Sequence, residues 1–315
     1  MVSIKKILGR ALITIPLIFA PIASSGLEQK INESILKYNF TPPSPDYCNV
    51  KHTDISWKEV KQGLEFSKVE VYNDNKLVDI IAVLKINPKY NELKVFTAFN
   101  NYDSDSLKTI EEWQEISGAV ALFNSAQYKA QPWGGSCGLN IRRGKTFGPK
   151  KNDKVKGMLV SGPIKEGLPE MDLLDFKYDK FDANNVLYKE GVQHWPILLD
   201  RTSSIRVKKT DWQANRTVVA KDWNKNILVF TTEGGFFTLY NFGKFLKESN
   251  QRKDKGFNVH TAMNMDGGYE AEMMIKSDKI NYLTYGKYET YGVNNNVSVL
   301  DARMDLPTIL GIFSK

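Results

Sequence analysis

Short runs of β-branched and aromatic residues, separated by turn-forming residues, constrain this 315-residue chain most strongly. Ser67–Tyr72, Asp79–Ile86 and Leu93–Phe99 are such runs, and Asn, Asp and Pro lie between them. Val, Ile, Tyr and Phe fit a pleated, half-buried strand, whereas Asn, Asp and Pro favour turns. The pattern therefore predicts that a sheet is the scaffold of the protein.

The remaining segments extend this prediction along the chain. Further strands are predicted at Ala119–Phe123, Ile197–Asp200, Thr217–Lys221, Asn226–Thr232, His260–Asn264, Glu272–Ile275, Ile280–Thr284, Val297–Leu300 and Thr308–Ile312. Helices are predicted at Leu27–Tyr38, at Ser106–Ile116 and after Thr238, a candidate N-cap. Ala130–Tyr188, which contains Gly, Pro and Lys throughout, is predicted as long loops, although disorder would look similar. The predicted fold class is α+β: one large domain with a mixed, largely antiparallel sheet covered by a few helices.

The N-terminus has the pattern of a secretory signal peptide. Lys5, Lys6 and Arg10 precede the apolar run Ala11–Ala23, and small residues follow before Gly26. An uncleaved anchor is the alternative. We therefore expect a signal peptide at 1–25, a connecting segment at 26–55 and one domain at 56–315, exported to the periplasm or secreted, with no membrane span after cleavage.

The charge of the chain does not favour a nucleic-acid partner. The formal net charge is +7, and three of these charges lie in the predicted leader, which leaves 7 − 3 = +4. Basic clusters such as Arg142-Arg143 are then interpreted as solvated loops. Two cysteines, Cys48 and Cys137, could form one disulfide in an oxidising compartment or remain free thiols.

Several common catalytic motifs do not occur in the sequence. The letters G-x-S-x-G occur at Gly134–Gly138, but inside the predicted loops and not in a strand–turn–helix elbow. There is no P-loop and no H-E-x-x-H, and the three histidines (His52, His194 and His260) are far apart. A histidine metal site and a cysteine nucleophile are therefore disfavoured.

The segment Asn264–Glu270 is the best candidate for a functional site. Asp266 follows a short predicted buried strand, where open sheets present functional residues. Gly267-Gly268 permits positive φ and a backbone anion nest, and Asn264 and Glu270 flank it with an amide and a second carboxylate. A plain Asp-Gly-Gly turn is the alternative interpretation.

An ordered series of segments supports the site. The series comprises Phe123–Tyr128, Gln193–Leu198, Asn215–Ala220, Thr231–Gly235, Thr238–Tyr240, the segment around Asp266, Tyr291–Asn296 and Leu306–Gly311. It resembles the phosphodiester glycosidase family, whose animal member removes N-acetylglucosamine to uncover mannose 6-phosphate. Three departures concern the substrate: Ser125 and Trp195 each stand where Gly is usual, and Tyr269-Glu270 replace a common Gly/Pro-Ser.

The resemblance implies hydrolysis of a sugar-1-phosphodiester, such as an N-acetylglucosaminyl diester or a related phosphoglycan. Asp266 would act as base or nucleophile, and Glu233 or Glu270 would supply the second carboxylate. Arg216 and the amides of Gly267 and Gly268 would hold the phosphate.

Asn124 and Asn264 would bind sugar hydroxyls. The sequence points to no certain cofactor, and metal dependence stays open because a carboxylate cluster could hold a divalent cation. The alternative function is a secreted protein that binds a glycan or phosphosugar without turnover.

Overall fold

The computed structural model describes residues 47–129, 135–291, 296–299 and 303–315. These residues belong to one compact unit, Pro42–Lys315. The predicted leader and the predicted helix at Leu27–Tyr38 lie outside the described residues. Within the described part of the chain, no helix is long and apolar enough to cross a membrane.

The first sheet has eight strands in the order β1-β3-β4-β14-β13-β15-β12, with β2 paired to β3. Its strands are β1 (Val50–His52), β2 (Lys58–Lys61), β3 (Leu64–Asn73), β4 (Lys76–Ile86), β12 (Ile197–Leu199), β13 (Thr217–Asp222), β14 (Ile227–Thr232) and β15 (Val259–Asn264). The predicted hairpin of β13 and β14 is confirmed, with Thr217 opposite Thr231. The segment predicted as connecting, 26–55, contributes the edge strand β1.

The second sheet lies where long loops were predicted. It has the order β10-β9-β11-β7-β8, and its strands are β7 (Asn140–Arg142), β8 (Lys145–Phe147), β9 (Gly157–Pro163), β10 (Met171–Asp175) and β11 (Tyr188–His194). The prediction of irregular structure at Ala130–Tyr188 is therefore wrong where these strands lie, whereas loops connect them. Glycine was interpreted as a loop residue, but Gly157 in β9 and Gly191 in β11, just beyond this segment, lie in strands where close packing requires glycine. A Cβ on Gly157 would lie 2.8 Å from Ile197 Cδ1, and one on Gly191 would lie 2.6 Å from Met158 Cε.

The third sheet has the order β17-β16-β6-β20-β5, and a separate two-stranded ladder joins β18 to β19. The strands are β5 (Asn91–Thr97), β6 (Ala121–Asn124), β16 (Glu272–Lys276), β17 (Asn281–Tyr285), β18 (Tyr288–Tyr291), β19 (Asn296–Val299) and β20 (Thr308–Ser314). The predicted hairpin of β16 and β17 is confirmed.

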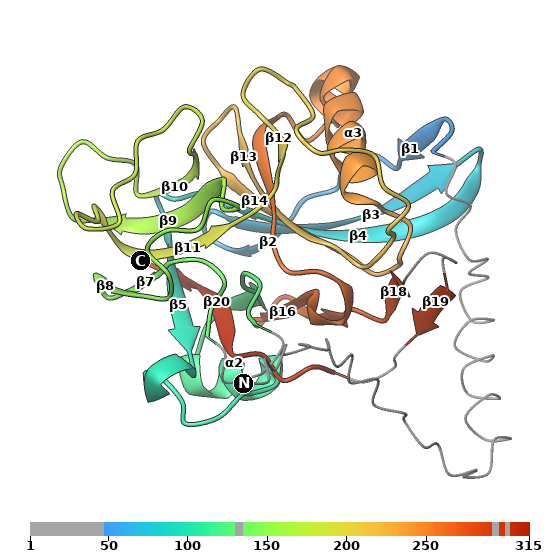
Figure 1. The fold of residues 1–315 in the computed structure, drawn as a ribbon. Helices are drawn as coiled ribbons and strands as arrows, with labels where there is room; N and C mark the ends of the chain where they lie inside the picture. Colours follow the sequence, from blue (N-terminus) through green and yellow to red (C-terminus); the bar gives the residue numbers. More distant parts are fainter. Residues whose placement is uncertain (1–46, 130–134, 292–295, 300–302) are drawn as a thin grey trace, which may run out of the picture. The chain divides into compact units, whose positions relative to one another are not determined.

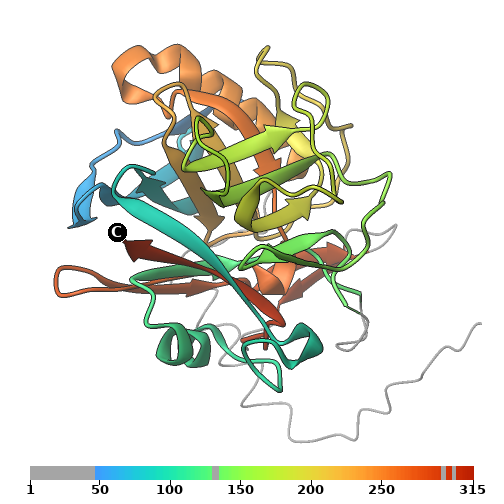
Figure 2. The same ribbon diagram turned by 90° about the vertical axis from the view of Figure 1, so that its left-hand side faces the viewer.

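Two α-helices cover the outer faces of the first and third sheets (Figures 1 and 2). The first, α2 (Ile110–Ser117), begins with a capping box between Thr109 and Glu112. The second, α3 (Leu239–Ser249), begins at the predicted cap, where Thr238 Oγ1 accepts a hydrogen bond from Asn241 N (3.1 Å). Short 3-10 turns lie at η1 (Phe99–Asn101), η2 (Asn250–Lys255) and η3 (Gly268–Glu270).

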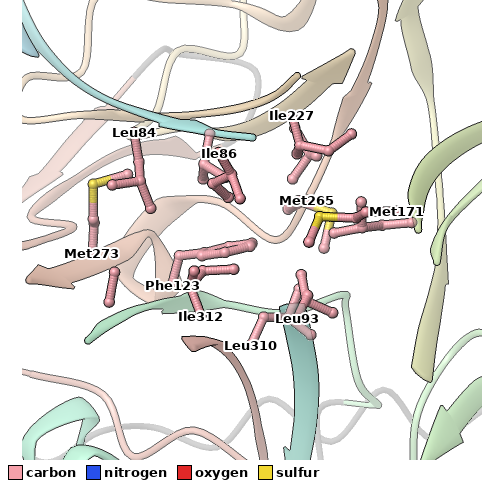
Figure 3. Close-up of a cluster of buried hydrophobic side chains, with 14 of the residues drawn as sticks. Leu84, Ile86, Leu93, Phe123, Met171, Ile227, Met265, Met273, Leu310 and Ile312 are labelled. Atoms are coloured by element: carbon pink, nitrogen blue, oxygen red, sulfur yellow. The ribbon is translucent and has the colours of Figure 1, made fainter. Parts of the chain in front are cut away.

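The main core lies between the inner faces of the three sheets (Figure 3). Alternation along β13 and β14 explains it, because successive side chains point to opposite faces of a strand. Val219 and Val229 enter the main core, whereas Val218 and Phe230 pack on the other face beneath α3. The middle of each strand is buried on both faces, so its apolar residues are consecutive in the sequence and do not alternate with polar ones.

The observed architecture agrees roughly with the predicted α+β class as a single domain built on a largely antiparallel sheet, and it refines this prediction in two respects. The protein is predominantly β, and every strand pair among the described residues is antiparallel, so the sheet is not mixed. Instead of one sheet covered by helices, three sheets cover one another around the core.

Candidate active site

The predicted site lies where strands of the first and third sheets end beside each other. After β15, Met265 N–H donates to Thr217 O (2.8 Å), and Asp266 N–H donates to Ser125 O (3.1 Å). Thr217 begins β13 and Ser125 follows β6. Asp266 is thus fixed between two sheets by its own backbone.

Asn124 joins these strand ends from the inside. Its Nδ2 donates to Asp266 O (2.8 Å), a residue 142 positions away, and its Oδ1 accepts from Thr217 Oγ1 (2.6 Å) and from Glu272 N (3.0 Å). Asn124 is only 1 % exposed. Its amide is therefore occupied by the protein, and the predicted contact with sugar hydroxyls gives way to a role in positioning Asp266.

The Gly267-Gly268 turn is also fixed by the protein. Gly267 N–H donates to Asp266 Oδ1 (3.0 Å), and Gly268 N–H donates to Asn215 O (2.8 Å). Both amides are engaged, so they do not form the predicted nest for a phosphate. Only Gly268 has positive φ (+69°). Gly267 is required for space, because a Cβ there would lie 2.9 Å from Asn215 O.

Asn215 is the second buried organiser of the site. Its Nδ2 donates to Thr232 O (2.7 Å) and Gly234 O (3.0 Å), while its Oδ1 accepts from the amides of Lys287 and Tyr288 (2.8 Å each). These bonds tie the start of β13 to the end of β14 and to the start of β18. They hold the next residue, Arg216, in place.

Arg216 is buried beside the glycine turn. Its Nε donates to Phe237 O (3.1 Å) and its Nη2 to Trp212 O (2.7 Å). Its Nη1 lies 3.5 Å from the position that a Cβ on Gly267 would take. Burial lowers the pKa of Arg216 to about 10, and Glu289 opposes this shift, so the side chain remains charged at neutral pH. One fixed cation therefore lies next to Gly267.

Four carboxylates surround this turn. Asp266 and Glu270 are half-buried, Glu272 is fully buried at the start of β16, and Glu289 lies on β18. A Cβ on Gly268 would lie 2.7 Å from Glu289 Oε2, which shows how closely β18 approaches the turn. Tyr128 OH donates to Glu270 Oε1 at 3.4 Å.

The three acids of the Asp266–Glu272 segment have raised pKa values. Burial is the main cause of the raised pKa of Asp266, and Glu270 and Glu289 add to it. Burial and Glu289 raise the pKa of Glu270. Burial raises the pKa of Glu272 to about 8, and Glu270 and Asp305 contribute to the shift. Strongly perturbed carboxylates that cluster in this way are typical of functional sites.

Two of the predicted residues are engaged in other interactions. Glu233 pairs with Lys68 Nζ (2.6 Å) and accepts from Tyr282 OH (2.7 Å), instead of contacting Arg216 or Asp266. The backbone of Asn264 donates to Pro196 O (3.0 Å) and is bonded through its carbonyl to His194 Nδ1 (2.6 Å). Its side-chain Oδ1 has no hydrogen-bond partner within the described residues.

Four residues of the site were missed by sequence reasoning: Tyr128, Asn215, Glu272 and Glu289. Glu272 could have been found, because it is the second Glu after the Asp-Gly-Gly turn. Glu289 carries no local signal. It reaches the site through a bridge to Ala214, which lies far away in the sequence.

The predicted disulfide is absent from the structure. Cys48 is an exposed free thiol beside β1, and its amide donates to Asn73 Oδ1 (3.0 Å). Cys137 is a free thiol whose amide bonds to Gln127 O (3.0 Å), and its pKa is raised by burial and by Asp266. The two cysteines are thus held at different places, one at an edge strand and the other beside the site.

A divalent cation finds no ready-made group of ligands here. Within the ranges that the structure describes, no cluster of three or more His, Cys, Asp or Glu side chains has a geometry that could hold a metal ion. A cavity of about 370 Å³ is lined in part by Ser136. The backbone of Ser136 forms a β-bridge with Tyr128, so the cavity lies next to Tyr128. Phe99, Asn100 and Lys129 also line this cavity.

The fold and site define an antiparallel β protein with a carboxylate and arginine cluster at converging strand ends. The sequence profile of the phosphodiester glycosidase family matches residues 117–313. The chain belongs to this family, which confirms the resemblance predicted from the sequence. No curated protein matches the chain.

Solved structures share the fold at low sequence identity. The catalytic domain of zebrafish N-acetylglucosamine-1-phosphodiester α-N-acetylglucosaminidase, auto-inhibited by its pro-peptide, has a TM-score of 0.53 and 16% identity, covering 84% of this chain and 88% of that chain. A protein of Burkholderia pseudomallei, described as exported, has a TM-score of 0.56 and 8% identity, covering 86% and 98%. A hypothetical protein from Synechocystis has a TM-score of 0.51 and 11% identity, covering 84% and 64%.

Proposed function

We propose that this chain is an exported glycosidase-like hydrolase that cleaves a sugar-1-phosphodiester at Asp266. One observation carries the proposal: Asp266 and Glu270 meet beside the buried Arg216 at the strand ends. Membership of the phosphodiester glycosidase family supports the reaction class. The predicted signal peptide supports export, as does the description of the Burkholderia protein.

The leaving group determines what the site must supply. Cleavage of the bond between the anomeric carbon and oxygen expels a phosphate monoester, whose second pKa is about 6. Such a group leaves without protonation, and the sugar passes through an oxocarbenium-like state that a carboxylate stabilises. The enzyme must therefore stabilise charge on both sides of the broken bond.

Asp266 fits the role of base in this scheme. Its raised pKa makes it a stronger base than an ordinary aspartate, and a base is most effective when its pKa lies near the working pH. Water attacks the anomeric carbon and gives its proton to Asp266, while the electron pair of the C–O bond leaves with the phosphate. A direct nucleophilic attack by Asp266 is the other route that the proposal allows.

Arg216 and Glu270 complete the proposed machinery. The guanidinium of Arg216 lies beside Gly267 and supplies positive charge toward the phosphate. Glu270 is the second carboxylate and is oriented by Tyr128 OH. Asn124 fixes the backbone of Asp266, and Asn215 fixes the backbone next to Arg216.

Asp266→Asn tests the proposal directly. The variant keeps an acceptor for Gly267 N–H, so it should fold normally while losing about 10³-fold in kcat/KM. The assay follows release of N-acetylglucosamine from its methyl-capped 1-phosphodiester. Asp222→Asn is the matched control, since Asp222 is another buried aspartate with a raised pKa, at the opposite end of β13.

The outcomes separate hydrolase from binding protein. Activity that falls in Asp266→Asn and persists in Asp222→Asn supports the proposal. Equal turnover in wild type and Asp266→Asn would remove Asp266 from the mechanism. Stoichiometric heat in calorimetry with an intact diester would instead indicate a phosphosugar-binding protein.

A further inference from the structure

The three acids of the Asp266–Glu272 segment lack a cation. Within the described ranges, none of Asp266, Glu270 and Glu272 forms an ion pair. Arg216 is near, but it is held by two backbone carbonyls, and the charge that acts on it is that of Glu289. Without a cation, burial favours the protonated forms of these acids, as their raised pKa values indicate. A cationic ligand would allow them to ionise.

Glu272 makes the imbalance clearest. It is 0 % exposed, and neither of its carboxylate oxygens has a hydrogen bond of standard geometry within the part of the chain that is described. Glu270 raises the pKa of Glu272, and Glu272 in turn raises the pKa of Tyr128, so Glu272 belongs electrostatically to the cluster. The backbone amide of Met304 favours its charged form but does not outweigh burial. Ionisation of this buried carboxyl group is costly, so it stays protonated below its pKa of about 8 unless a cation compensates its charge.

Two of the three acids are partly exposed. Asp266 and Glu270 are half-buried and can contact a ligand, whereas Glu272 lies behind them at the start of β16. The buried guanidinium of Arg216 lies next to Gly267, the residue after Asp266. A ligand bound at this turn would therefore have both carboxylates and one positive charge close to it.

We propose that the substrate carries a protonated amine close to its phosphodiester, and that Glu270 receives this ammonium while Arg216 receives the phosphate and Asp266 stays free to act as the base. The inference rests on the proposed function and specifies its substrate class as a zwitterionic sugar phosphodiester. An ammonium fits better than a metal ion, because no set of three metal-ligating side chains with suitable geometry exists among the described residues. Three hydrogen-bond donors on one ammonium match several carboxylate oxygens.

Two pairs of probes locate the amine. The first pair is glucosamine 1-phosphate against N-acetylglucosamine 1-phosphate, which places the charge on the sugar. The second pair is the aminoethyl against the hydroxyethyl 1-phosphodiester of N-acetylglucosamine, which places it on the aglycone. Binding of each is measured by calorimetry at pH 6.5. The cationic member of at least one pair should bind about tenfold more tightly, as expected for a hydrogen-bonded charge.

Glu270→Gln should remove this preference within the same pair. The ratio of affinities is compared, so a general loss of binding does not affect the conclusion. Glu65→Gln is the matched control, because Glu65 is also a partly buried glutamate but is already paired with Lys85. The ratio should stay at its wild-type value in this control. Glu270→Asp keeps the charge and should restore part of the preference.

Proton release gives an independent readout. A cation that approaches the cluster lowers the pKa values of its acids, so binding of the aminoethyl diester should release protons to the buffer, and binding of the hydroxyethyl diester should not. Calorimetry in two buffers of different ionisation enthalpy measures this difference. Equal affinities in both pairs would overturn the inference, as would a preference that survives Glu270→Gln. Binding of Ca²⁺ or Mg²⁺ alone that Glu270→Gln abolishes would also overturn it.

The test separates the two proposals. A preference for the amine without turnover contradicts only the hydrolase function. Turnover of both diesters at equal rates, with equal affinities, contradicts only the inference about the amine.

Discussion

Two clusters of buried charge in this protein are built in opposite ways. In the first, Arg142 lies between Asp103 (3.0 Å) and Glu190 (3.2 Å), and the amides of Val95 and Arg143 also donate to Glu190. In the second, Asp266, Glu270 and Glu272 form no ion pair among the described residues. The first cluster has its own cation, which is what structural ion pairs require, and the interpretation of Arg142 as part of a solvated loop is wrong, because Arg142 is buried on β7. The second cluster has no cation of its own among the described residues, so a ligand would have to supply one, as is typical of a binding site.

The largest expected effect comes from breaking the first cluster. Arg142→Leu leaves two carboxylates buried without their cation, so the free energy of unfolding should fall by about 3–5 kcal/mol. Chemical denaturation measures it. The double variant Arg142→Leu, Glu190→Leu should recover part of the loss, because one stranded charge is then removed. A loss below about 1 kcal/mol would mean that the cluster does not behave as an ion-paired unit.

The next effect is the pH dependence of stability from Glu272. Its pKa is about 8 in the folded protein and 4.5 when unperturbed, so the unfolded state ionises first. The contribution of Glu272 to stability is therefore present below about pH 4.5 and is lost as pH rises toward 8, at most by about 1.4 kcal/mol per pH unit.

Unfolding of the wild type and of Glu272→Gln across this window tests the prediction. The variant should show a flatter profile than the wild type, and Glu65→Gln should keep the wild-type slope. Parallel profiles for wild type and Glu272→Gln would show that Glu272 ionises normally in the folded protein.

A smaller gain in stability is expected at the site. Glu270→Gln removes repulsion among the carboxylates, so at pH 8 it should raise the free energy of unfolding by about 0.5–1 kcal/mol while activity falls. Thermal denaturation and the diester assay measure the two quantities on the same sample. A variant that is less stable than the wild type would show that Glu270 is compensated in the free protein.

The smallest effect is expected where solvent screens the charge. Asp278 is 72% exposed and pairs with Lys61 at 3.6 Å. Asp278→Asn should change the free energy of unfolding by less than about 0.5 kcal/mol, because water stabilises both partners without the pair. A larger change in the free energy of unfolding, measured by chemical denaturation, would show that this exposed ion pair also stabilises the fold.

Local pattern predicted those parts of the fold that depend on neighbours in sequence. The hairpins of β13 with β14 and of β16 with β17 were found because their apolar runs are separated by short turns. The cap at Thr238 was found because a side-chain acceptor there satisfies the first turn of α3. The second sheet was missed, since Gly157 and Gly191 look like loop residues until their packing against Ile197 and Met158 is known.

The roles of site residues depended on contacts that no local pattern contains. Asn124 was predicted to bind sugar, but its amide is occupied by Asp266, Thr217 and Glu272. The amides of Gly267 and Gly268 were predicted to hold phosphate, but they bond to Asp266 and Asn215. Glu233 was predicted as a catalytic candidate and is engaged by Lys68 and Tyr282.

The sequence by itself determined most strands of the first and third sheets, the start of α3, the family and the position of Asp266 after a buried strand. Side-chain periodicity and turn chemistry act over a few residues, so they can be read directly from the chain. Only the tertiary structure decided that β6, β13, β15 and β18 converge, and that Glu272 and Glu289 join Asp266 there. The pKa of a carboxylate depends on burial and on charges brought from distant segments, and these exist only once the sheets have packed.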